Sequence, residues 1–387
     1  MVIFATLGFA RNYTVYETPS PKISTVDTKE KTTEPEKATP DSIVIEENIK
    51  NKEQESAAKI EEEIAPAAHP DSEIAEELQK EAAVKQEEGT AVSQQIQIQE
   101  TLIEPSVLNQ KIREAVINIF CLSGSGSFSY PGSASGVIID ERGIILTNAH
   151  IAQYFLLKDY PSPGNIECTI RTGSPAKPEY RGELLFMPTV WVEENKKTLK
   201  LKTSYSTGEH DYALIRITES TNSALTLPDA FPFLAVDVGT SRLRHNEPLM
   251  LGGYPAGFLS GFSITKDLWL ISTVSSIHDI YTFRADTPDV IAVKGAPIAQ
   301  EGSSGGVFVD FVTGKLLGII TTRTAGETTG ERELRALSLH YINHDFEESA
   351  GETLESYVAG DIEERALVFK TQISPYLTGL IASELDK

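Results

Sequence analysis

The stretch Gln300-Glu-Gly-Ser-Ser-Gly-Gly306 is short, polar and rich in glycine, and apolar segments frame it on both sides. Val290-Ile-Ala-Val293 precedes it and Val307-Phe-Val309 follows it, which predicts a tight loop between two buried strands. Glycines allow such a loop to turn several backbone N–H groups toward one point. A serine at its tip would meet an incoming carbonyl with its hydroxyl and those N–H groups. Gly/Ser clusters are more often ordinary turns, so the rest of the chain must supply the partners of such a serine.

The composition is that of an acidic chain with enough apolar residues for a sizeable core. It has 387 residues, 40% of them hydrophobic, and a net charge of −22, which argues against nucleic acid or an anionic membrane as the main partner. Residues 1–104 carry 10 Lys and Arg against 22 Asp and Glu and therefore hold −12 of that charge. The two cysteines, Cys121 and Cys168, are either buried thiols or one bridge.

The first hundred residues have the composition of a solvated spacer. Residues 11–104 have too few large apolar side chains to fold alone, which predicts disorder. Within them, residues 71–88 have helical spacing and predict either a partner-dependent helix or a solvated charged one. The apolar run 2–10 is too short to cross a bilayer and is interpreted as the remnant of a secretory signal or as an ordinary N-terminus.

From Pro105 onward the chain is predicted to consist mainly of short strands. Residues 106–113 suit a helix capped by Ser106, and helices are expected again at 353–358 and 374–385. Many short strands separated by turns are typical of an antiparallel all-β barrel or sandwich, with residues 221–246 connecting two β subdomains. The predicted strands are 115–122, 134–140, 144–150, 167–171, 180–187, 212–217, 248–252, 268–277, 290–294, 307–311, 315–322 and 336–342.

Three residues form a candidate catalytic set. If Ser304 is a nucleophile, it needs a base and a group that orients the base. His150 follows the strand at 144 after small residues, and Asp211 directly precedes the strand 212–217, so the order is His, Asp, Ser. Taken singly, the histidine could be an ordinary one and Asp211 a turn residue, and Ser303 competes with Ser304.

That order closely resembles the trypsin-like serine peptidases, and within them the bacterial Deg, or high-temperature-requirement, type. The resemblance covers about residues 106–346. It is carried by Thr147-Asn-Ala-His150, His210-Asp-Tyr-Ala-Leu-Ile215 and Gly302-Ser-Ser-Gly-Gly306, with further matches at Ser135-Gly-Val-Ile-Ile-Asp140, Leu249-Met-Leu-Gly-Gly-Tyr-Pro-Ala-Gly257 and Ser272-Thr-Val-Ser-Ser-Ile277.

The resemblance implies a serine endopeptidase of two antiparallel β-barrels, at about 114–225 and 246–346, with the active site between them. The peptidase domain would span 105–346, and a helical extension 347–387. His150 would be the base, Asp211 its orienting carboxylate and Ser304 the nucleophile. Backbone N–H groups of Gly302 and Ser304 would form the oxyanion hole.

By the same resemblance, Ile298 and Ala299 would form the floor of the primary specificity pocket, and Thr321, Thr322 and Arg323 a wall. With no acidic residue at the floor, we expect cleavage after a small or medium apolar side chain.

The chain also departs from the family pattern. Ser303 stands where digestive enzymes have an aspartate and Deg-like enzymes commonly an asparagine, and no Ile-Val-Gly-Gly activation sequence is present. About 60 residues separate His150 from Asp211, and the extra length is expected in the polar segment 173–202. Fewer than 50 residues follow the last predicted strand, so we expect no PDZ domain.

We therefore expect an extracytoplasmic serine endopeptidase that acts on protein or peptide substrates, with no cofactor, metal or nucleic acid. His340 and His344 would straddle the end of a strand, which argues against a metal pair. A catalytically silent or regulated binding module of the same fold is the alternative. Homo-oligomers are common among Deg-like enzymes, and the acidic segment could instead be an interaction arm with its own partner.

Overall fold

The structure of the chain, a computed structural model, describes residues 102–123, 132–197, 207–283, 287–324 and 328–387. The expected signal remnant, the helix at 71–88 and residues 11–101 of the acidic spacer lie outside these described residues. The last residues of the predicted spacer belong to the fold instead, since Ile103 N donates to Phe311 O over 2.9 Å. The described residues fall within one unit, residues 98–387.

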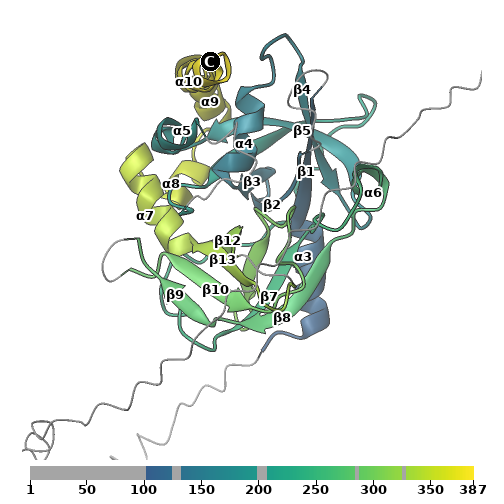
Figure 1. Cartoon of the computed structure of the whole chain (residues 1–387), viewed down its shortest axis with the longest axis vertical. Helices are drawn as coiled ribbons and strands as arrows, with labels where there is room; N and C mark the ends of the chain where they lie inside the picture. Colours follow the sequence, from purple (N-terminus) through teal and green to yellow (C-terminus); the bar gives the residue numbers. More distant parts are fainter. Residues whose placement is uncertain (1–101, 124–131, 198–206, 284–286, 325–327) are drawn as a thin grey trace, which may run out of the picture. The chain divides into compact units, whose positions relative to one another are not determined.

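Six strands form a closed antiparallel barrel in the order β1-β2-β3-β6-β5-β4 (Figure 1). The strands predicted at 134–140 and 144–150 pair as an antiparallel hairpin, with Val137 opposite Leu146 and Ile138 opposite Ile145. Every residue of β3 is buried, because its two faces pack into different apolar clusters, Ile144 and Leu146 in one and Ile145 in the other. The strands are β1 (Val116–Ser123), β2 (Gly132–Asp140), β3 (Ile144–Thr147), β4 (Ile166–Thr172), β5 (Lys177–Phe186) and β6 (Ala213–Ser220).

A second antiparallel sheet of seven strands forms a half-barrel, in the order β8-β7-β11-β12-β13-β10-β9. Leu251, Ile291 and Phe308 are fully buried in its core. The prediction of an all-β fold with two barrel-like units is confirmed. The strands are β7 (Pro248–Gly253), β8 (Ile271–Ser276), β9 (Asp279–Tyr281), β10 (Val290–Lys294), β11 (Val307–Asp310), β12 (Leu316–Arg323) and β13 (Glu333–Ser338).

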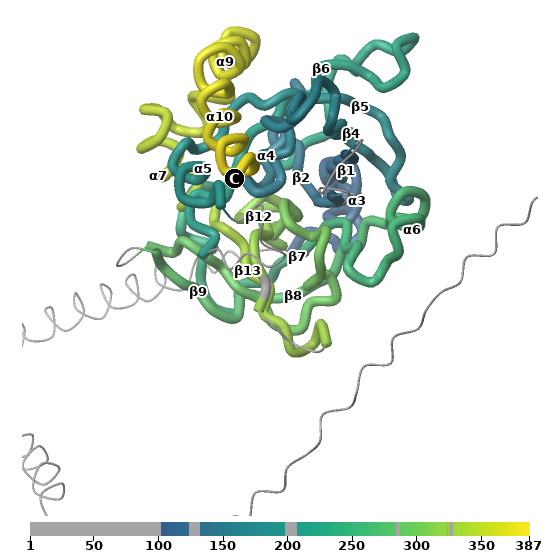
Figure 2. The backbone as a smooth tube through the Cα atoms, turned by 45° about the horizontal axis from the view of Figure 1, so that its top comes forward, coloured from purple at the N-terminus to yellow at the C-terminus, as the bar shows by residue number. Residues whose placement is uncertain are grey.

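Helices at the C-terminal end cover the outside of the first barrel (Figures 1 and 2). Phe369, Leu377 and Ile381 are buried in the same apolar cluster as Ile145 and Trp191, so this end of the chain extends the core of that barrel. None of the described helices is long and apolar enough to cross a membrane. The helices are α3 (Pro105–Ala115), α4 (Ala149–Leu156), α5 (Thr189–Asn195), α6 (Gly261–Lys266), α7 (Leu339–Ala350), α8 (Leu354–Ala359), α9 (Ile362–Val368), the π-helical turn η3 (Phe369–Ile373) and α10 (Ser374–Leu385).

Two predicted strands end earlier than expected, each because a helix begins. The strand predicted at 144–150 stops at Thr147, and α4 starts at Ala149. The strand predicted at 336–342 stops at Ser338, whose side chain accepts a hydrogen bond from Tyr341 N and caps α7. Helix α7, Leu339–Ala350, therefore runs across the expected boundary between the peptidase domain, 105–346, and the helical extension, 347–387.

Other boundaries also differ. Helix α3 starts at Pro105 with Glu104, not Ser106, at the N-cap position, since proline is favoured in a first helical turn. Within the segment 173–202, where the extra length was expected, β5 corresponds to the strand predicted at 180–187, and helix α5 was not predicted. Trp191 and Val192 of α5 are buried, so this length is part of the first barrel's packing.

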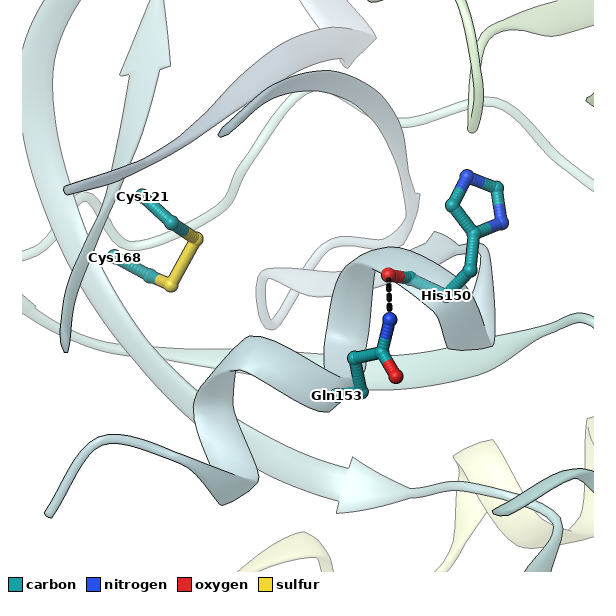
Figure 3. The surroundings of a disulfide bond; sticks show 4 residues. All are labelled: Cys121, His150, Gln153 and Cys168. Carbon is teal, nitrogen blue, oxygen red and sulfur yellow. Dashed lines mark hydrogen bonds between the residues drawn. A yellow bond between two sulfur atoms is a disulfide. The ribbon is translucent and has the colours of Figure 1, made fainter. Parts of the chain in front are cut away.

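A disulfide joins Cys121 to Cys168 (Figure 3). The two residues lie opposite each other on the paired strands β1 and β4, a position from which antiparallel strands bring side chains within bonding distance. The structure therefore decides between the two states that the sequence left open.

Candidate active site

His150 and Asp211 meet because the ends of two paired strands meet. Thr147, the last residue of β3, lies opposite Ala213, the first residue of β6. His150 follows β3 in the first turn of α4, and Asp211 precedes β6 by two residues. Strand register within the first barrel thus places both side chains together.

The Asp211 carboxylate is buried, and both of its oxygens accept hydrogen bonds. Its Oδ2 lies 2.8 Å and its Oδ1 3.1 Å from His150 Nδ1. The backbone N–H of His150 donates to Oδ1 over 2.9 Å, so the carboxylate also binds the N-terminal turn of α4, where a negative charge is stabilised. Thr321 Oγ1 on β12 donates to Oδ2 over 2.7 Å. Asp211 is held from both barrels.

These contacts change the pKa values of both groups. Burial disfavours the charged imidazolium, but the charge and hydrogen bond of Asp211 outweigh it, and the pKa of His150 is raised. Burial likewise opposes ionisation of Asp211, yet His150, the Thr321 hydroxyl and the backbone N–H together lower its pKa. The geometry therefore favours an ionised Asp211 that binds Nδ1 of the ring and leaves Nε2 for other partners.

Neighbouring side chains fix this pair further. Asn148 Nδ2 donates to the Asp211 carbonyl over 3.0 Å, and Gln153 Nε2 donates to the His150 carbonyl over 2.7 Å (Figure 3). His210, directly before Asp211, has a φ of 58°, and its Nδ1 lies 2.8 Å from Asp345 Oδ1 on α7. Helix α7 thereby anchors the backbone beside the catalytic candidate Asp211.

The serine loop joins β10 to β11 of the half-barrel. Ser304 is partly exposed, whereas the residues on either side of it are buried. Gly302 and Gly305 have φ of 90° and 80°. A Cβ on Gly302 would lie 2.6 Å from Tyr254 O, and one on Gly305 would lie 2.0 Å from Ser135 O, so both positions require glycine.

The loop is bound to the first barrel through Ser304 itself. The Ser304 carbonyl accepts from Ser135 N on β2 over 2.7 Å, and Gly305 N donates to Ile320 O on β12 over 2.8 Å. The N–H groups of Gly302 and Ser304 donate to none of the described residues and are free for a ligand oxygen. The Ser304 hydroxyl makes no hydrogen bond with a described residue, and catalytic contacts of this kind often tighten only when substrate binds.

Ser303 does not compete for the role of Ser304. It is fully buried, and its hydroxyl donates to Ile298 O over 2.6 Å within the same half-barrel.

The residues predicted to shape the specificity pocket differ in their burial and contacts. Ile298 and Ala299 are fully buried in the half-barrel core, and Arg332 Nη1 donates to the Ala299 carbonyl. Thr321 is buried, and its hydroxyl donates to Asp211 Oδ2. Thr322 is half-buried, and Arg323 ends β12, with a side chain outside what the structure describes.

Sequence reasoning missed the bond from Thr321 to Asp211. The two residues are 110 positions apart, and their contact depends on how the half-barrel packs against the first barrel. His340 and His344 lie on α7 rather than on a strand, so their spacing is helical after all. His340 Nδ1 donates to Val238 O, and among the described residues no three His, Cys, Asp or Glu side chains are grouped as a metal would require.

Residues 134–319 match the family model described as a trypsin-like peptidase domain. A search of curated proteins found no match. The matched range contains His150, Asp211 and Ser304 and most strands of both barrel units. The match and the barrel architecture together support a trypsin-like serine peptidase domain.

Proposed function

We propose that this protein is a serine endopeptidase in which His150, Asp211 and Ser304 form the catalytic triad. The observation that carries the proposal is the buried Asp211 carboxylate bonded to Nδ1 of His150, because this bond fixes the ring tautomer that a general base needs. The family match to a peptidase domain over the same residues supports it.

The proposed chemistry follows from these positions. His150 Nε2 takes the proton of the Ser304 hydroxyl while Ser304 Oγ attacks the substrate carbonyl carbon. The N–H groups of Gly302 and Ser304 stabilise the resulting oxyanion. His150 then gives its proton to the leaving amine, and the C–N bond breaks to leave an acyl-enzyme. A water molecule, deprotonated by His150, hydrolyses the acyl-enzyme and regenerates Ser304.

A fluorophosphonate probe tests this assignment because it reacts with an activated serine. We expect labelling of the wild type, none of Ser304→Ala, and continued labelling of Ser303→Ala at a reduced rate, since Ser303 supports the loop. A wild type that stays unlabelled would favour the alternative, a catalytically silent or regulated binding module.

The substrate is proposed to be a protein or peptide with a small or medium apolar residue before the cleaved bond. Ile298 and Ala299 offer no charge partner for Lys or Arg. Profiling with a peptide library checks this preference, and strict cleavage after Lys or Arg would reject it.

We further propose a Deg-like enzyme that works outside the cytoplasm. The motifs around Ser135 and His150 support the first part. The Cys121–Cys168 bridge supports the second, because disulfides persist in oxidising compartments. The proposal also includes formation of a homo-oligomer and binding of a partner by the acidic segment 11–104.

A further inference from the structure

Ser135 lies at the place where the first barrel contacts the serine loop. It is fully buried on β2. Its backbone N–H donates to Ser304 O, and its own carbonyl accepts from Thr147 Oγ1 over 2.8 Å. One residue thus touches the loop of the proposed nucleophile and the strand that leads to His150.

The hydroxyl of Ser135 makes two further bonds. It donates to Gly302 O over 2.9 Å and accepts from Tyr254 N over 2.9 Å. A hydroxyl has one proton to donate. Because the backbone N–H of Tyr254 is itself a donor, the Ser135 proton is donated to the Gly302 carbonyl. The side chain therefore has a defined direction between Tyr254, which directly follows β7, and the loop.

The loop's two free N–H groups are oriented through the carbonyls of their own peptides. In a planar trans peptide the C=O and the following N–H point in opposite directions, so fixing one fixes the other. Glu301 O, in the same peptide as Gly302 N, accepts from Ala256 N over 2.7 Å. Ser303 O, in the same peptide as Ser304 N, accepts from Gly306 N over 2.8 Å.

The peptide between these two is the one that Ser135 holds. Its carbonyl belongs to Gly302, which has a φ of 90° and, because it has no Cβ, adopts this conformation without strain. The side chains of Gln300 and Ser303 donate to Pro297 O and Ile298 O of the same half-barrel, so neither bond links the loop to the first barrel.

We propose that Ser135 is a positioning residue that holds the middle peptide of the serine loop, and so aligns the N–H groups of Gly302 and Ser304 on the substrate oxyanion. Because the Ser135 hydroxyl binds the serine loop from the first barrel, the conformation of the loop depends on how the half-barrel packs against that barrel. The inference rests on the proposed peptidase function.

The test compares Ser135→Ala with Ser133→Ala, a matched loss of a hydroxyl two residues earlier on β2. Ser133 Oγ accepts from Asn118 Nδ2, which also donates to Ala134 O, and it has no bond to the loop. The readouts are kcat and KM on a peptide substrate, the inhibition constant of a peptide boronic acid that forms a tetrahedral anionic adduct, and thermal unfolding.

We expect Ser135→Ala to lower kcat by about 10-fold or more, below the 10²–10³-fold cost of removing an oxyanion donor itself, with KM changed less than about 2-fold. Boronic acid binding should weaken by a similar factor as kcat. Ser133→Ala should behave as the wild type. Equal kcat and boronic acid affinity in the two variants would overturn the role of Ser135.

Ser135→Cys serves if Ser135→Ala is unfolded at the assay temperature. Its thiol is a weaker donor in a similar volume, so kcat should fall less than in Ser135→Ala but remain below that of the wild type. Wild-type kcat in Ser135→Cys would contradict the proposal. A wild type that shows no Ser304-dependent labelling by fluorophosphonate would instead refute the proposed function, which separates the two failures.

Discussion

The first barrel and the half-barrel contribute to the candidate site in different ways. The first barrel closes on itself, and its strand register alone brings His150 to Asp211. The half-barrel presents Ser304 on a loop whose carbonyls are held partly by residues of the first barrel, above all Ser135. The proposed base and its carboxylate are thus brought together within one sheet, whereas the loop of the proposed nucleophile depends on how the half-barrel fits the first barrel.

The largest effect should come from breaking the pair within the first barrel. Asp211→Asn keeps the size of the side chain but favours the wrong imidazole tautomer, and we expect turnover to fall on the order of 10³–10⁴-fold. Steady-state hydrolysis of a peptide substrate measures it. A loss below about 10-fold would show that Asp211 does not orient His150.

The same variant should change the pH dependence of kcat/KM. Activity needs neutral His150, and Asp211 raises the pKa of this group above its ordinary value of 6.5, so the acid limb of the wild type should have its midpoint above that value. Removing the carboxylate's charge lets burial dominate, and the residual activity of Asp211→Asn should have a midpoint at lower pH. An unmoved acid limb would assign that limb to another group.

Removing the disulfide should affect the stability of the first barrel rather than the chemistry. The bridge joins residues 47 positions apart, and Cys121→Ser with Cys168→Ser should lower the free energy of unfolding by about 2–4 kcal/mol. Denaturant unfolding of the wild type and the double variant measures the loss. Peptidase activity in the absence of denaturant should be retained, and its loss would place the bridge in the active-site support.

Thr321 tests the contact that runs from the half-barrel to the first barrel. Thr321→Val removes the hydroxyl bonded to Asp211 Oδ2 and keeps the shape of the side chain, so kcat should fall about 10-fold or less. The hydroxyl also lowers the pKa of Asp211. Thr273→Val, at a half-buried position on β8 of the same half-barrel, is the control and should remain within about 2-fold of the wild type. Equal kcat in both variants would show that the first barrel positions Asp211 without help from Thr321.

The smallest effect should come from the contact of α7 with His210. Burial disfavours the charged ring, yet contact with Asp345 outweighs it and raises the pKa of His210. The protonated ring therefore stabilises the fold, fully so below pH 6.5, and this contribution is lost as the pH rises through the raised pKa.

Asp345→Asn removes that contribution, which we expect to be about 1 kcal/mol. The difference in unfolding free energy between wild type and variant should be largest below pH 6.5 and shrink in alkaline solution. A difference that grows with pH would have the wrong sign for this account.

Sequence patterns could predict what depends on short stretches of chain. Alternating apolar runs and turns indicated most strands, and the glycines around Ser304 indicated its loop. The starts of α4 at Ala149 and of α7 at Leu339 were missed, although Asn148 and Ser338 are residue types favoured at helix N-caps, because apolar residues continue on both sides of them. The bonds from Thr321 to Asp211 and from Ser135 to Gly302 join distant residues and exist only once the two sheets associate.

The central claim is that Ser304 forms a covalent acyl-enzyme with His150 as its base. The most direct measurement incubates the protein with an activated ester, quenches in acid and locates the acyl group by peptide mapping and mass spectrometry. We predict one acyl group, on Ser304, and on the same time scale none in His150→Ala. An acyl group on another residue, or equal acylation of His150→Ala, would contradict the account.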